Sequence, residues 1–372
     1  MTPVTVVGGG ASGLSAAGAL AHRGIRVTVL EQDAVIGGTW SRRYDRLHLH
    51  TVRGFSGLAH YPIPRRFPTY LSRDQVVEYL QDYVSHFDFQ IEFNATAEKI
   101  RREGDTWRVD LAGGGVCQSR VVVLASGQYR QPIVPAWTGR DVYAGRLTHS
   151  SDYRNGAPYV GQRVLVVGVG NSGAEIATDL IDSGAASVAV SVRTPPPVVP
   201  RDPFGMPVQR TSILLSALPV AIANRIGRTT ARLVLGDLTK YGMPAADFNP
   251  YTTRRVPLID VGFVDALKRG RVTVRPAVDH LTRDGAVFAD GSSEPFDTIV
   301  AATGFATTLA LLLDVPGLLD EQGEPRGVAG EPTSAPGLYF VGFTHSLRGH
   351  LFEANLASRR LARHVERYLR QP

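Results

Sequence analysis

Two glycine-rich turns are the segments of this chain whose residue types and spacing most clearly suit a chemical task. They read Gly8-Gly9-Gly10-Ala11-Ser12-Gly13 and Gly168-Val169-Gly170-Asn171-Ser172-Gly173, and both follow the pattern G-x-G-x-x-G. In such a turn the first glycine permits a tight bend, the second lets the backbone approach a pyrophosphate, and the third lets a helix pack on a strand. The helix that follows directs free N–H groups and the positive end of its dipole at the phosphates. The pattern therefore predicts two dinucleotide sites.

The residue that ends the next strand indicates which dinucleotide each turn binds. Glu31 closes a strand predicted over 27–30, and an acid there accepts hydrogen bonds from ribose hydroxyls and repels a 2′-phosphate. Ser191 occupies the matching place in the second half, and Arg193 and Thr194 follow it. Because a guanidinium pairs with phosphate in bidentate geometry, we expect NADPH at the second turn, with its 2′-phosphate bound by Arg193 together with Thr194 or Arg201. The alternative is that Arg193 is a solvated surface residue.

The elements around the two turns repeat. Strands are predicted over 4–7 and 164–167, directly before the turns, and a small-residue helix follows each turn. Each half closes with an apolar strand, Val121–Leu124 or Thr298–Ala301. Alternation of strand, helix and strand predicts parallel sheets covered by helices. The expected fold class is α/β, with two Rossmann-like dinucleotide-binding domains.

The domain boundaries are expected to follow these halves. Residues 1–155 would form the first segment of one domain, 156–304 the second domain, and 305–372 a return to the first. An insertion at about 195–257 is punctuated by proline and resembles neither half. Its segment 212–234 carries arginines at helical spacing. We expect an amphipathic helix that covers the second domain or forms a homodimer contact, with a channel lid and a membrane-surface helix as alternatives.

The composition limits the class of protein. The 372 residues are 43% hydrophobic and 20% charged, with a formal net charge of +6. No run of five basic residues suggests a nucleic-acid partner, and the N-terminus lacks the basic region of a signal peptide. The single cysteine, Cys117, fits a reducing compartment and excludes a dithiol redox centre. We expect a cytoplasmic protein with a small-molecule substrate and no nucleic-acid or membrane partner.

A third motif, Tyr143-x-Gly145-x-x-x-His149-x-x-x-Tyr153, lies between the two halves. Together with both glycine turns it resembles the flavin-containing monooxygenases, particularly their plant YUCCA-like branch. The family pattern has Phe in place of Tyr143, and Tyr153 stands where many Baeyer–Villiger enzymes carry Trp. The resemblance covers nearly the whole chain and includes the following segments: Gly37-Gly38-Thr39-Trp40, Phe67-Pro68-Thr69-Tyr70, Leu235-Gly236-Asp237, Pro257-Leu258-Ile259-Asp260-Val261-Gly262, Ala302-Thr303-Gly304-Phe305 and Val341-Gly342-Phe343-Thr344.

The resemblance implies FAD in the first domain and NADPH in the second, in an arrangement similar to that of glutathione reductase. With the two turns, it assigns to FAD the residues Gly8, Gly10, Ser12, Gly13, Glu31, Gly38, Thr39, Trp40, His50, Gly127 and Gly342. The residues assigned to NADPH are Gly168, Gly170, Asn171, Ser172, Gly173, Arg193, Thr194, Thr303 and Gly304. No metal site is expected.

The reaction implied by the resemblance is carried by the flavin, with molecular oxygen as co-substrate. NADPH would reduce the flavin, oxygen would add to form a C4a-peroxyflavin, and one oxygen atom would pass to a small organic substrate. That outcome is N- or S-oxygenation or the oxidative decarboxylation of a 2-oxo acid. Baeyer–Villiger oxidation of a ketone, and NADPH oxidase or reductase activity without oxygen transfer, are the alternatives.

No protein nucleophile is required by this chemistry, so the candidate catalytic residues are few. The resemblance places His149 at the interdomain hinge near NADP, and a hydrogen-bonded linker histidine is its structural alternative. Arg53 is expected to have a structural or FAD-phosphate role, with pairing to a substrate carboxylate as the alternative.

Overall fold

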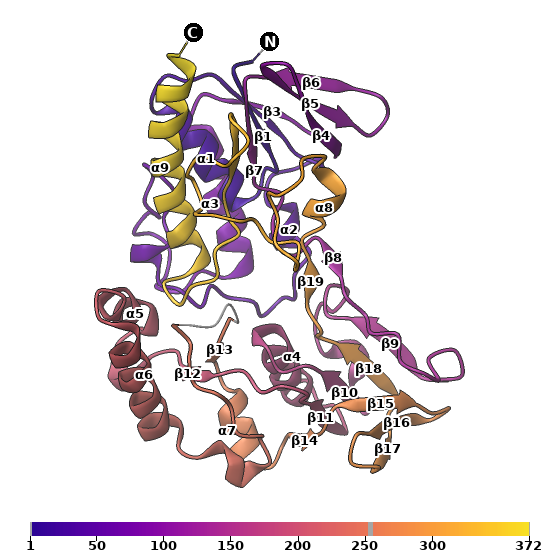
Figure 1. The fold of residues 1–372 in the computed structure, drawn as a ribbon. Coiled ribbons are helices and arrows are strands. Elements are labelled where there is room, and N and C mark those ends of the chain that lie inside the picture. Colours follow the sequence, from indigo (N-terminus) through magenta and orange to yellow (C-terminus); the bar gives the residue numbers. More distant parts are fainter. Residues whose placement is uncertain (1, 252–255, 372) are drawn as a thin grey trace. The chain divides into compact units, whose positions relative to one another are not determined.

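The computed structural model describes residues 2–251 and 256–371, and the chain divides into two compact units (Figure 1). Unit 1 holds the segment that ends at Ser41, together with Thr51–Gln131 and the chain from Phe305 onward. Unit 2 holds Arg42–His50 and Pro132–Gly304. The boundary predicted from the sequence lay between residues 155 and 156 instead, with residues 42–50 in the first domain. Segment 132–155 groups with unit 2 because its strand joins that unit's sheet.

Unit 1 is built on a five-stranded parallel sheet whose central strands are short runs of valine and leucine. These strands are completely buried, as expected when helices cover both faces of a parallel sheet. The order across the sheet is β20 (Leu338–Phe340), β7 (Val121–Leu124), β1 (Val4–Val7), β2 (Val27–Leu30) and β3 (Gln90–Glu92).

Helices α1 (Ala11–Ala21) and α9 (His350–Leu369) pack together along unit 1 (Figure 1). The contact between α1 and α9 is close because α1 consists largely of alanine and glycine. Helix α3 (Arg73–His86) also approaches α1 closely, since a Cβ at Gly18 would overlap the hydroxyl of Tyr83 on α3. The remaining elements of unit 1 are α2 (Gly38–Ser41), the 3-10 turn η1 (Arg53–Phe55), β19 (Phe305–Ala306), α8 (Leu309–Leu312) and an antiparallel sheet of β4 (Ala97–Glu103), β5 (Thr106–Leu111) and β6 (Val116–Ser119). Strand β8 (Gln131–Pro132) lies at the boundary, with Gln131 in unit 1 and Pro132 in unit 2.

Unit 2 repeats the plan with a second five-stranded parallel sheet. Its order is β14 (Thr273–Arg275), β11 (Ser187–Ser191), β10 (Arg163–Val167), β18 (Thr298–Ala301) and β9 (Arg146–His149). The other elements outside the insertion are η2 (Ala157–Tyr159), α4 (Asn171–Asp182), α7 (Phe263–Lys268) and the antiparallel strands β15 (Val278–Leu281), β16 (Gly285–Phe288) and β17 (Ser293–Pro295). Two sheets of this kind confirm the predicted α/β class with two Rossmann-like units.

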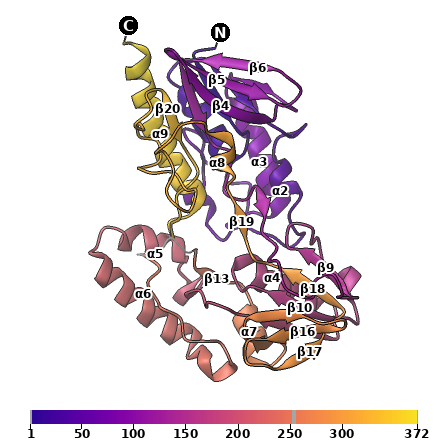
Figure 2. The ribbon, with the colours of Figure 1, turned by 45° about the vertical axis from the view of Figure 1, so that its right-hand side comes forward.

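Segment 212–234, which was predicted as one amphipathic helix, spans parts of two helices. Helix α5 (Val208–Leu215) is followed by α6 (Val220–Leu235), with α5 near the upper end of α6 in Figure 2. Pro219 separates them, because proline lacks the N–H that a continuous helix would use. The insertion also contains β12 (Val198–Pro200), η3 (Pro203–Gly205), η4 (Leu238–Tyr241) and β13 (Leu258–Asp260).

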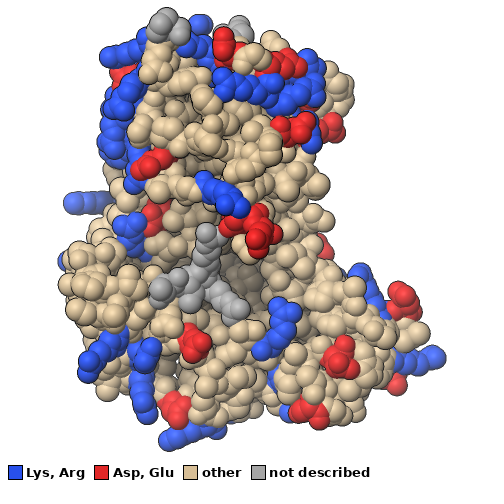
Figure 3. Space-filling view, in the orientation of Figure 1, with Lys and Arg blue, Asp and Glu red and all other residues tan. Residues whose placement is uncertain are grey.

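The surface of α5 and α6 is apolar and basic. Leu214 and Leu233 are largely exposed, and the sequence from 203 to 236 holds four arginines and no acidic residue. In Figure 3 this region is mostly tan with a few blue side chains. Within residues 2–251 and 256–371, no helix combines the length and apolar character needed to cross a bilayer.

Candidate functional site

The first glycine turn has two glycines that the fold itself requires and one that it does not. A Cβ at Gly8, which has a φ of 109°, would lie 2.5 Å from the carbonyl oxygen of Ala125. A Cβ at Gly13 would overlap the carbonyl oxygen of Gly8. A Cβ at Gly10 would meet nothing within 4 Å. The chain therefore leaves open space beside Gly10, at the start of α1.

The second turn likewise has two crowded glycines and one glycine beside open space. A Cβ at Gly168 would lie 2.6 Å from the carbonyl oxygen of Ala302, and one at Gly173 would overlap Gly168, whereas Gly170 faces open space. Neither α1 nor α4 has a side-chain cap on its first turn. The uncapped N–H groups next to open space fit a pyrophosphate at both turns.

Glu31 lies directly beside the first turn. Its Oε2 accepts a hydrogen bond from the N–H of Gly9 at 2.6 Å, and its Oε1 accepts one from the N–H of Asp33 at 2.8 Å. The half-buried Arg130 is close enough for its charge to interact with this carboxylate, and burial lowers the pKa of Arg130. Arg130 was not predicted from the sequence. Its position just after the turn that closes the first half could have indicated a basic group near the first glycine turn.

A second helix begins beside the first turn. Gly342 has a φ of 92°, and a Cβ there would lie 2.6 Å from the Cβ of Ser12. His350, the first residue of α9, places its Nε2 3.1 Å from the hydroxyl oxygen of Ser12. Burial lowers the pKa of His350 to about 4, so its ring is neutral at neutral pH. The structure thus brings together Ser12 and Gly342, both predicted, and His350, which the sequence analysis missed.

The other residues assigned to FAD are distributed over two parts of unit 1. Gly38, Thr39 and Trp40 form most of α2, where the hydroxyl of Ser41 donates to the carbonyl of Gly38 at 3.0 Å. Gly127 has a φ of 83° and open space around its Cβ position, just beyond β7.

All three fixed side chains of the linker motif attach to unit 2. The hydroxyl of Tyr143 donates to the carbonyl of Phe296 at 3.0 Å, and that of Tyr153 donates to Asp179 at 2.6 Å. His149 lies at the end of β9, which pairs with β18. These contacts explain why residues 132–155 belong to unit 2.

His149 is buried and holds the end of β9 to the turn after β18. Its Nδ1 lies 3.0 Å from the hydroxyl of Ser151, and its Nε2 lies 3.1 Å from the carbonyl oxygen of Gly304. The hydroxyl of Thr303 donates to the carbonyl of Ile133 in the same turn. Burial lowers the pKa of His149. Of the two residues assigned to NADPH in this turn, Gly304 contacts His149 and Thr303 contacts Ile133.

The two residues predicted at the 2′-phosphate are exposed just beyond β11. Arg193 has no ion-pair or hydrogen-bond partner among the residues that the structure describes, and Thr194 is its exposed neighbour. The side chain of Asn171, which was assigned to NADPH, bonds to the protein's own backbone. Its amide donates to the carbonyl of Pro257 at 3.1 Å and accepts from the N–H of Ile259 at 2.8 Å. Asn171 therefore holds the chain around β13 against the start of α4.

Arg53 makes the structural contacts that were one of its predicted roles, whereas His50 has a partner that the sequence did not indicate. The Nη1 of Arg53 donates to the carbonyl of Arg65 at 3.0 Å and also to that of Phe67. His50 belongs to unit 2, where its Nε2 lies 2.6 Å from Oε1 of Glu175 on α4. The structure does not group His50 with the other residues assigned to FAD.

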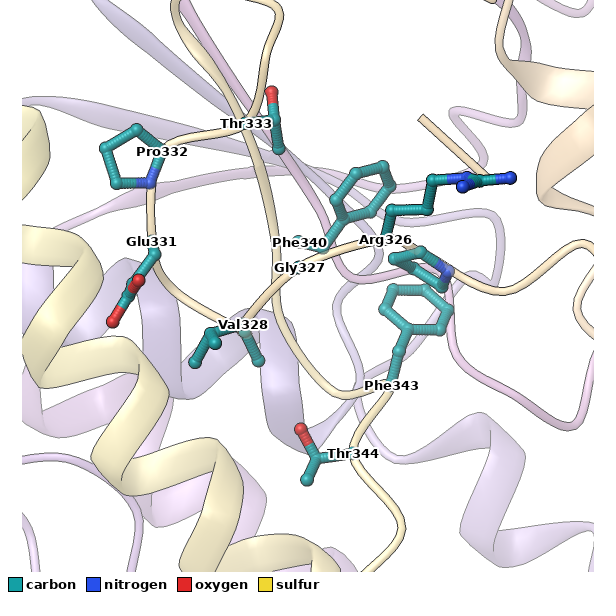
Figure 4. Close-up of a pocket in the computed structure, with 11 residues that line it drawn as sticks. Arg326, Gly327, Val328, Glu331, Pro332, Thr333, Phe340, Phe343 and Thr344 are labelled. Atoms are coloured by element: carbon teal, nitrogen blue, oxygen red, sulfur yellow. The ribbon is translucent and has the colours of Figure 1, made fainter. Parts of the chain in front are cut away.

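A small cavity in unit 1 lies between β20 and the loop 325–333 (Figure 4). Its volume is about 40 Å³, and the edge-to-face rings of Phe340 and Phe343 form part of its wall. That space holds a few water molecules but no organic substrate.

Comparison with known proteins identifies the family. The model of the flavin-binding monooxygenase-like family matches residues 2–318. The chain belongs to this family. It is 39% identical to indole-3-pyruvate monooxygenase YUCCA1 of Oryza sativa subsp. japonica, over 91% of this chain and 86% of that protein. It is 35% identical to indole-3-pyruvate monooxygenase YUCCA6 of Arabidopsis thaliana, over 100% of this chain and 92% of that protein.

Solved structures of flavin monooxygenases share the fold. A flavin-containing monooxygenase from Stenotrophomonas maltophilia superposes with a TM-score of 0.75 at 24% identity, over 99% of this chain and 100% of that chain. An oxidized steroid monooxygenase bound to NADP gives a TM-score of 0.75 at 20% identity, over 97% of this chain and 84% of that chain. The protein is accordingly an FAD- and NADPH-dependent flavin monooxygenase that transfers an oxygen atom from molecular oxygen to a small organic substrate, as the resemblance implied.

Proposed function

We propose that this flavin monooxygenase acts on a 2-oxo acid with an aryl side chain and releases carbon dioxide. The supporting observation is the 39% identity over 91% of the chain to a protein named as an indole-3-pyruvate monooxygenase. The balanced reaction converts the 2-oxo acid, NADPH, a proton and oxygen into the shortened acid, carbon dioxide, NADP and water. One oxygen atom enters the acid and the other enters water.

The first glycine turn is the proposed site of FAD. The open space at Gly10, the uncapped start of α1 and the carboxylate of Glu31 suit a pyrophosphate followed by a ribose with free hydroxyls. Ser12, Gly13 and the start of α9 would contact the same cofactor. When bound, the flavin supplies the electron transfer and the activation of oxygen.

The second glycine turn is the proposed site of NADPH. Gly170 leaves the same open space, and Arg193 is an exposed guanidinium beyond the end of β11. A 2′-phosphate could accept hydrogen bonds from the guanidinium of Arg193 and from the hydroxyl of Thr194. Thr303 and Gly304 would lie along the cofactor at the end of β18.

The candidate catalytic residues are proposed to act as positioning groups. His149 would hold the turn of Thr303 and Gly304 through its bond to the Gly304 carbonyl. Arg53 would fix the segment from Arg65 to Phe67 through two carbonyls. In this proposal the protein binds, orients and shields the cofactors and provides no nucleophile.

A product assay with isotopically labelled oxygen tests the proposed reaction. The enzyme is supplied with FAD, NADPH and one of four substrates: indole-3-pyruvate, a cyclic ketone, a tertiary amine or a thioether. Catalase is included because free hydrogen peroxide itself decarboxylates 2-oxo acids. We expect one labelled atom in indole-3-acetate and one carbon dioxide for each NADPH consumed.

The other outcomes assign the alternatives. Labelled lactone from the ketone without labelled acid would show Baeyer–Villiger chemistry, and an N-oxide or sulfoxide would show heteroatom oxygenation. Consumption of NADPH without an oxygenated product from any substrate, together with peroxide release in a parallel assay without catalase, would show an oxidase. Each of these results would contradict the 2-oxo acid proposal.

Two further expectations remain proposals. A cytoplasmic location rests on the single cysteine, Cys117, which suits a reducing compartment. A homodimer rests on the exposed Leu214 and Leu233 of α5 and α6, since apolar patches of this kind suit protein contacts. Light scattering of the wild type and of Leu233→Glu would test the dimer, which the added charge should weaken.

A further inference from the structure

A groove in unit 2 is lined by none of the residues assigned to FAD or NADPH. It lies along α6 (Figure 2), and its volume is about 510 Å³. Small-molecule sites in proteins usually have volumes of about 300–1,000 Å³, so the groove is large enough for an organic ligand. The lining residues are Val220, Ala221, Asn224, Arg225, Arg228 and Asn249.

The groove is built from one face of α6 and the chain around Asn249. All the other lining residues lie on α6, at spacings that put them on one side of the helix. The N–H of Tyr251 donates to Oδ1 of Asn224 at 3.2 Å. Nη2 of Arg228 donates to the carbonyl of Phe248 at 3.3 Å. These contacts fix the two sides of the groove to each other.

The charge of the groove is positive. Its described lining includes two arginines and no acidic residue. Arg225 has no ion-pair or hydrogen-bond partner among residues 2–251 and 256–371, and the Phe248 carbonyl is the partner of Arg228. Because Arg225 and Arg228 are three positions apart, their side chains are neighbours on the helix surface. A guanidinium binds a carboxylate through two parallel hydrogen bonds, so the groove suits a carboxylate.

The rest of the lining suits an organic body attached to that carboxylate. Val220 and Ala221 offer apolar surface at the start of α6, and Asn224 and Asn249 are uncharged. The carbon stems of arginine side chains add apolar area, and a guanidinium plane stacks on an aromatic ring. The matching ligand has an anionic head and an aryl body. The aryl 2-oxo acid and the shortened aryl acid of the proposed reaction both have this chemistry.

We propose that the groove is a second binding site for an aryl carboxylate, in addition to the site of oxygen transfer. Its ligand is the acid that the enzyme consumes or the acid that it releases, and this identity rests on the proposed function. A dimer contact at Leu233 need not cover the groove, because Leu233 lies on a different face of α6 from Val220, Asn224 and Arg228. Binding at the groove keeps the acid at the enzyme surface.

Photoaffinity labelling of the FAD-loaded enzyme tests this proposal. The probe is 5-azidoindole-3-acetate, and mass spectrometry of the digested protein locates the attached label. We expect the label on residues 220–228 of α6 or on residues 248–251 beside it. An excess of indole-3-acetate should suppress this labelling. Indole-3-acetamide, which has the same ring and no charge, should suppress it far less.

The double variant Arg225→Gln/Arg228→Gln tests the role of the two charges. Saturation of the groove label with increasing probe gives the Kd of this site alone, and we expect it to rise about tenfold or more, as for the loss of hydrogen bonds to a charged group. Arg232→Gln is the matched control, since it removes the same charge from α6 at a position outside the lining. The control should bind the probe as the wild type does. Circular dichroism checks folding, and Arg225→Gln alone replaces a double variant that does not fold.

The outcomes separate this inference from the proposed function. Label confined to other parts of the chain, or equal Kd values for the double variant and the wild type, would show that the groove does not bind aryl carboxylates. Suppression by inorganic phosphate as strong as that by indole-3-acetate would contradict the proposal and indicate a phosphate site. If the groove is labelled as expected and the oxygen assay yields no labelled acid, the proposed function fails and the groove remains a site for aryl carboxylates. If the labelled acid forms and the groove takes no label, only this inference fails.

Discussion

The hydroxyl of Tyr153 donates a hydrogen bond to Asp179 of α4 at 2.6 Å, and the Tyr153 side chain is completely buried. Burial and the hydrogen bond to Asp179 both raise the pKa of Tyr153, so its hydroxyl remains a donor at neutral pH. The last position of the linker motif is therefore a structural tie between the linker and the helix of the second glycine turn.

Removing this hydroxyl should destabilise unit 2. In Tyr153→Phe a buried hydrogen bond to a carboxylate is lost, which typically costs about 1.5–3 kcal/mol. Urea unfolding followed by the circular dichroism of the holoenzyme measures the change. Tyr159→Phe, which removes the hydroxyl from the ring stacked on Tyr153, is the control and should change stability far less. Equal losses in the two variants would show that the contact with Asp179 contributes nothing specific.

Two alanine substitutions in the first glycine turn should have different consequences. Gly10→Ala should fold, because its φ of −73° suits alanine and a Cβ there meets nothing within 4 Å. The added methyl group would occupy the space proposed for the pyrophosphate, so the variant should be isolated colourless. Gly13→Ala should instead fail to fold, since its Cβ would overlap the carbonyl of Gly8. Absorbance at the flavin band and circular dichroism distinguish the two results.

Gly170→Ala is the counterpart in the second turn. This variant should retain FAD and lose NADPH binding, because the open space there belongs to unit 2. A yellow Gly10→Ala protein would contradict the assignment of FAD to the first turn. A Gly170→Ala protein that loses FAD and keeps NADPH would reverse the assignment of the two turns.

Arg193→Ala should change the choice of nicotinamide cofactor. Loss of a guanidinium that pairs with the 2′-phosphate should raise the Kd for NADPH by about tenfold to a hundredfold, as for other charged hydrogen bonds, and leave that for NADH nearly unchanged. Anaerobic titration of the flavin enzyme with each nucleotide measures both constants. Arg201→Ala serves as control, since Arg201 already pairs with Asp202 at 2.8 Å. Equal changes in the Kd values for NADPH and NADH would show that Arg193 does not bind the 2′-phosphate.

His350 should make the stability of unit 1 depend on pH. Its folded pKa of about 4 lies below the ordinary value of 6.5, so the unfolded chain binds a proton first as the pH falls. The free energy of unfolding should therefore decline from pH 6.5 to about pH 4, by at most about 3 kcal/mol from this residue.

His350→Gln removes the titration while keeping a polar group beside Ser12. Urea midpoints at pH 7.5 and pH 5 should differ less for this variant than for the wild type. His280→Gln, at a partly exposed position in unit 2, should retain the wild-type pH dependence. A wild-type slope that persists in His350→Gln would assign the dependence to other groups.

Local patterns in the sequence determined the nucleotide-binding elements. The valine strands, the two glycine turns and Glu31 lie within short stretches of chain, and their geometry follows from backbone rules that act over a few residues. Gly8 and Gly13 could be predicted because strand, turn and helix are contiguous. The α/β class followed from the repetition of that unit.

Tertiary structure decided how distant segments are shared between the two units. The His350 ring, near the C-terminus, lies within hydrogen-bond distance of Ser12, and the His50 ring lies within hydrogen-bond distance of Glu175, 125 residues away in the sequence. No local pattern encodes such pairings, because each depends on which buried donor and acceptor the completed fold brings within hydrogen-bond distance. The linker motif was visible in the sequence, but only the contact of Tyr153 with Asp179 showed which unit holds it, since a buried hydroxyl must find its partner in three dimensions.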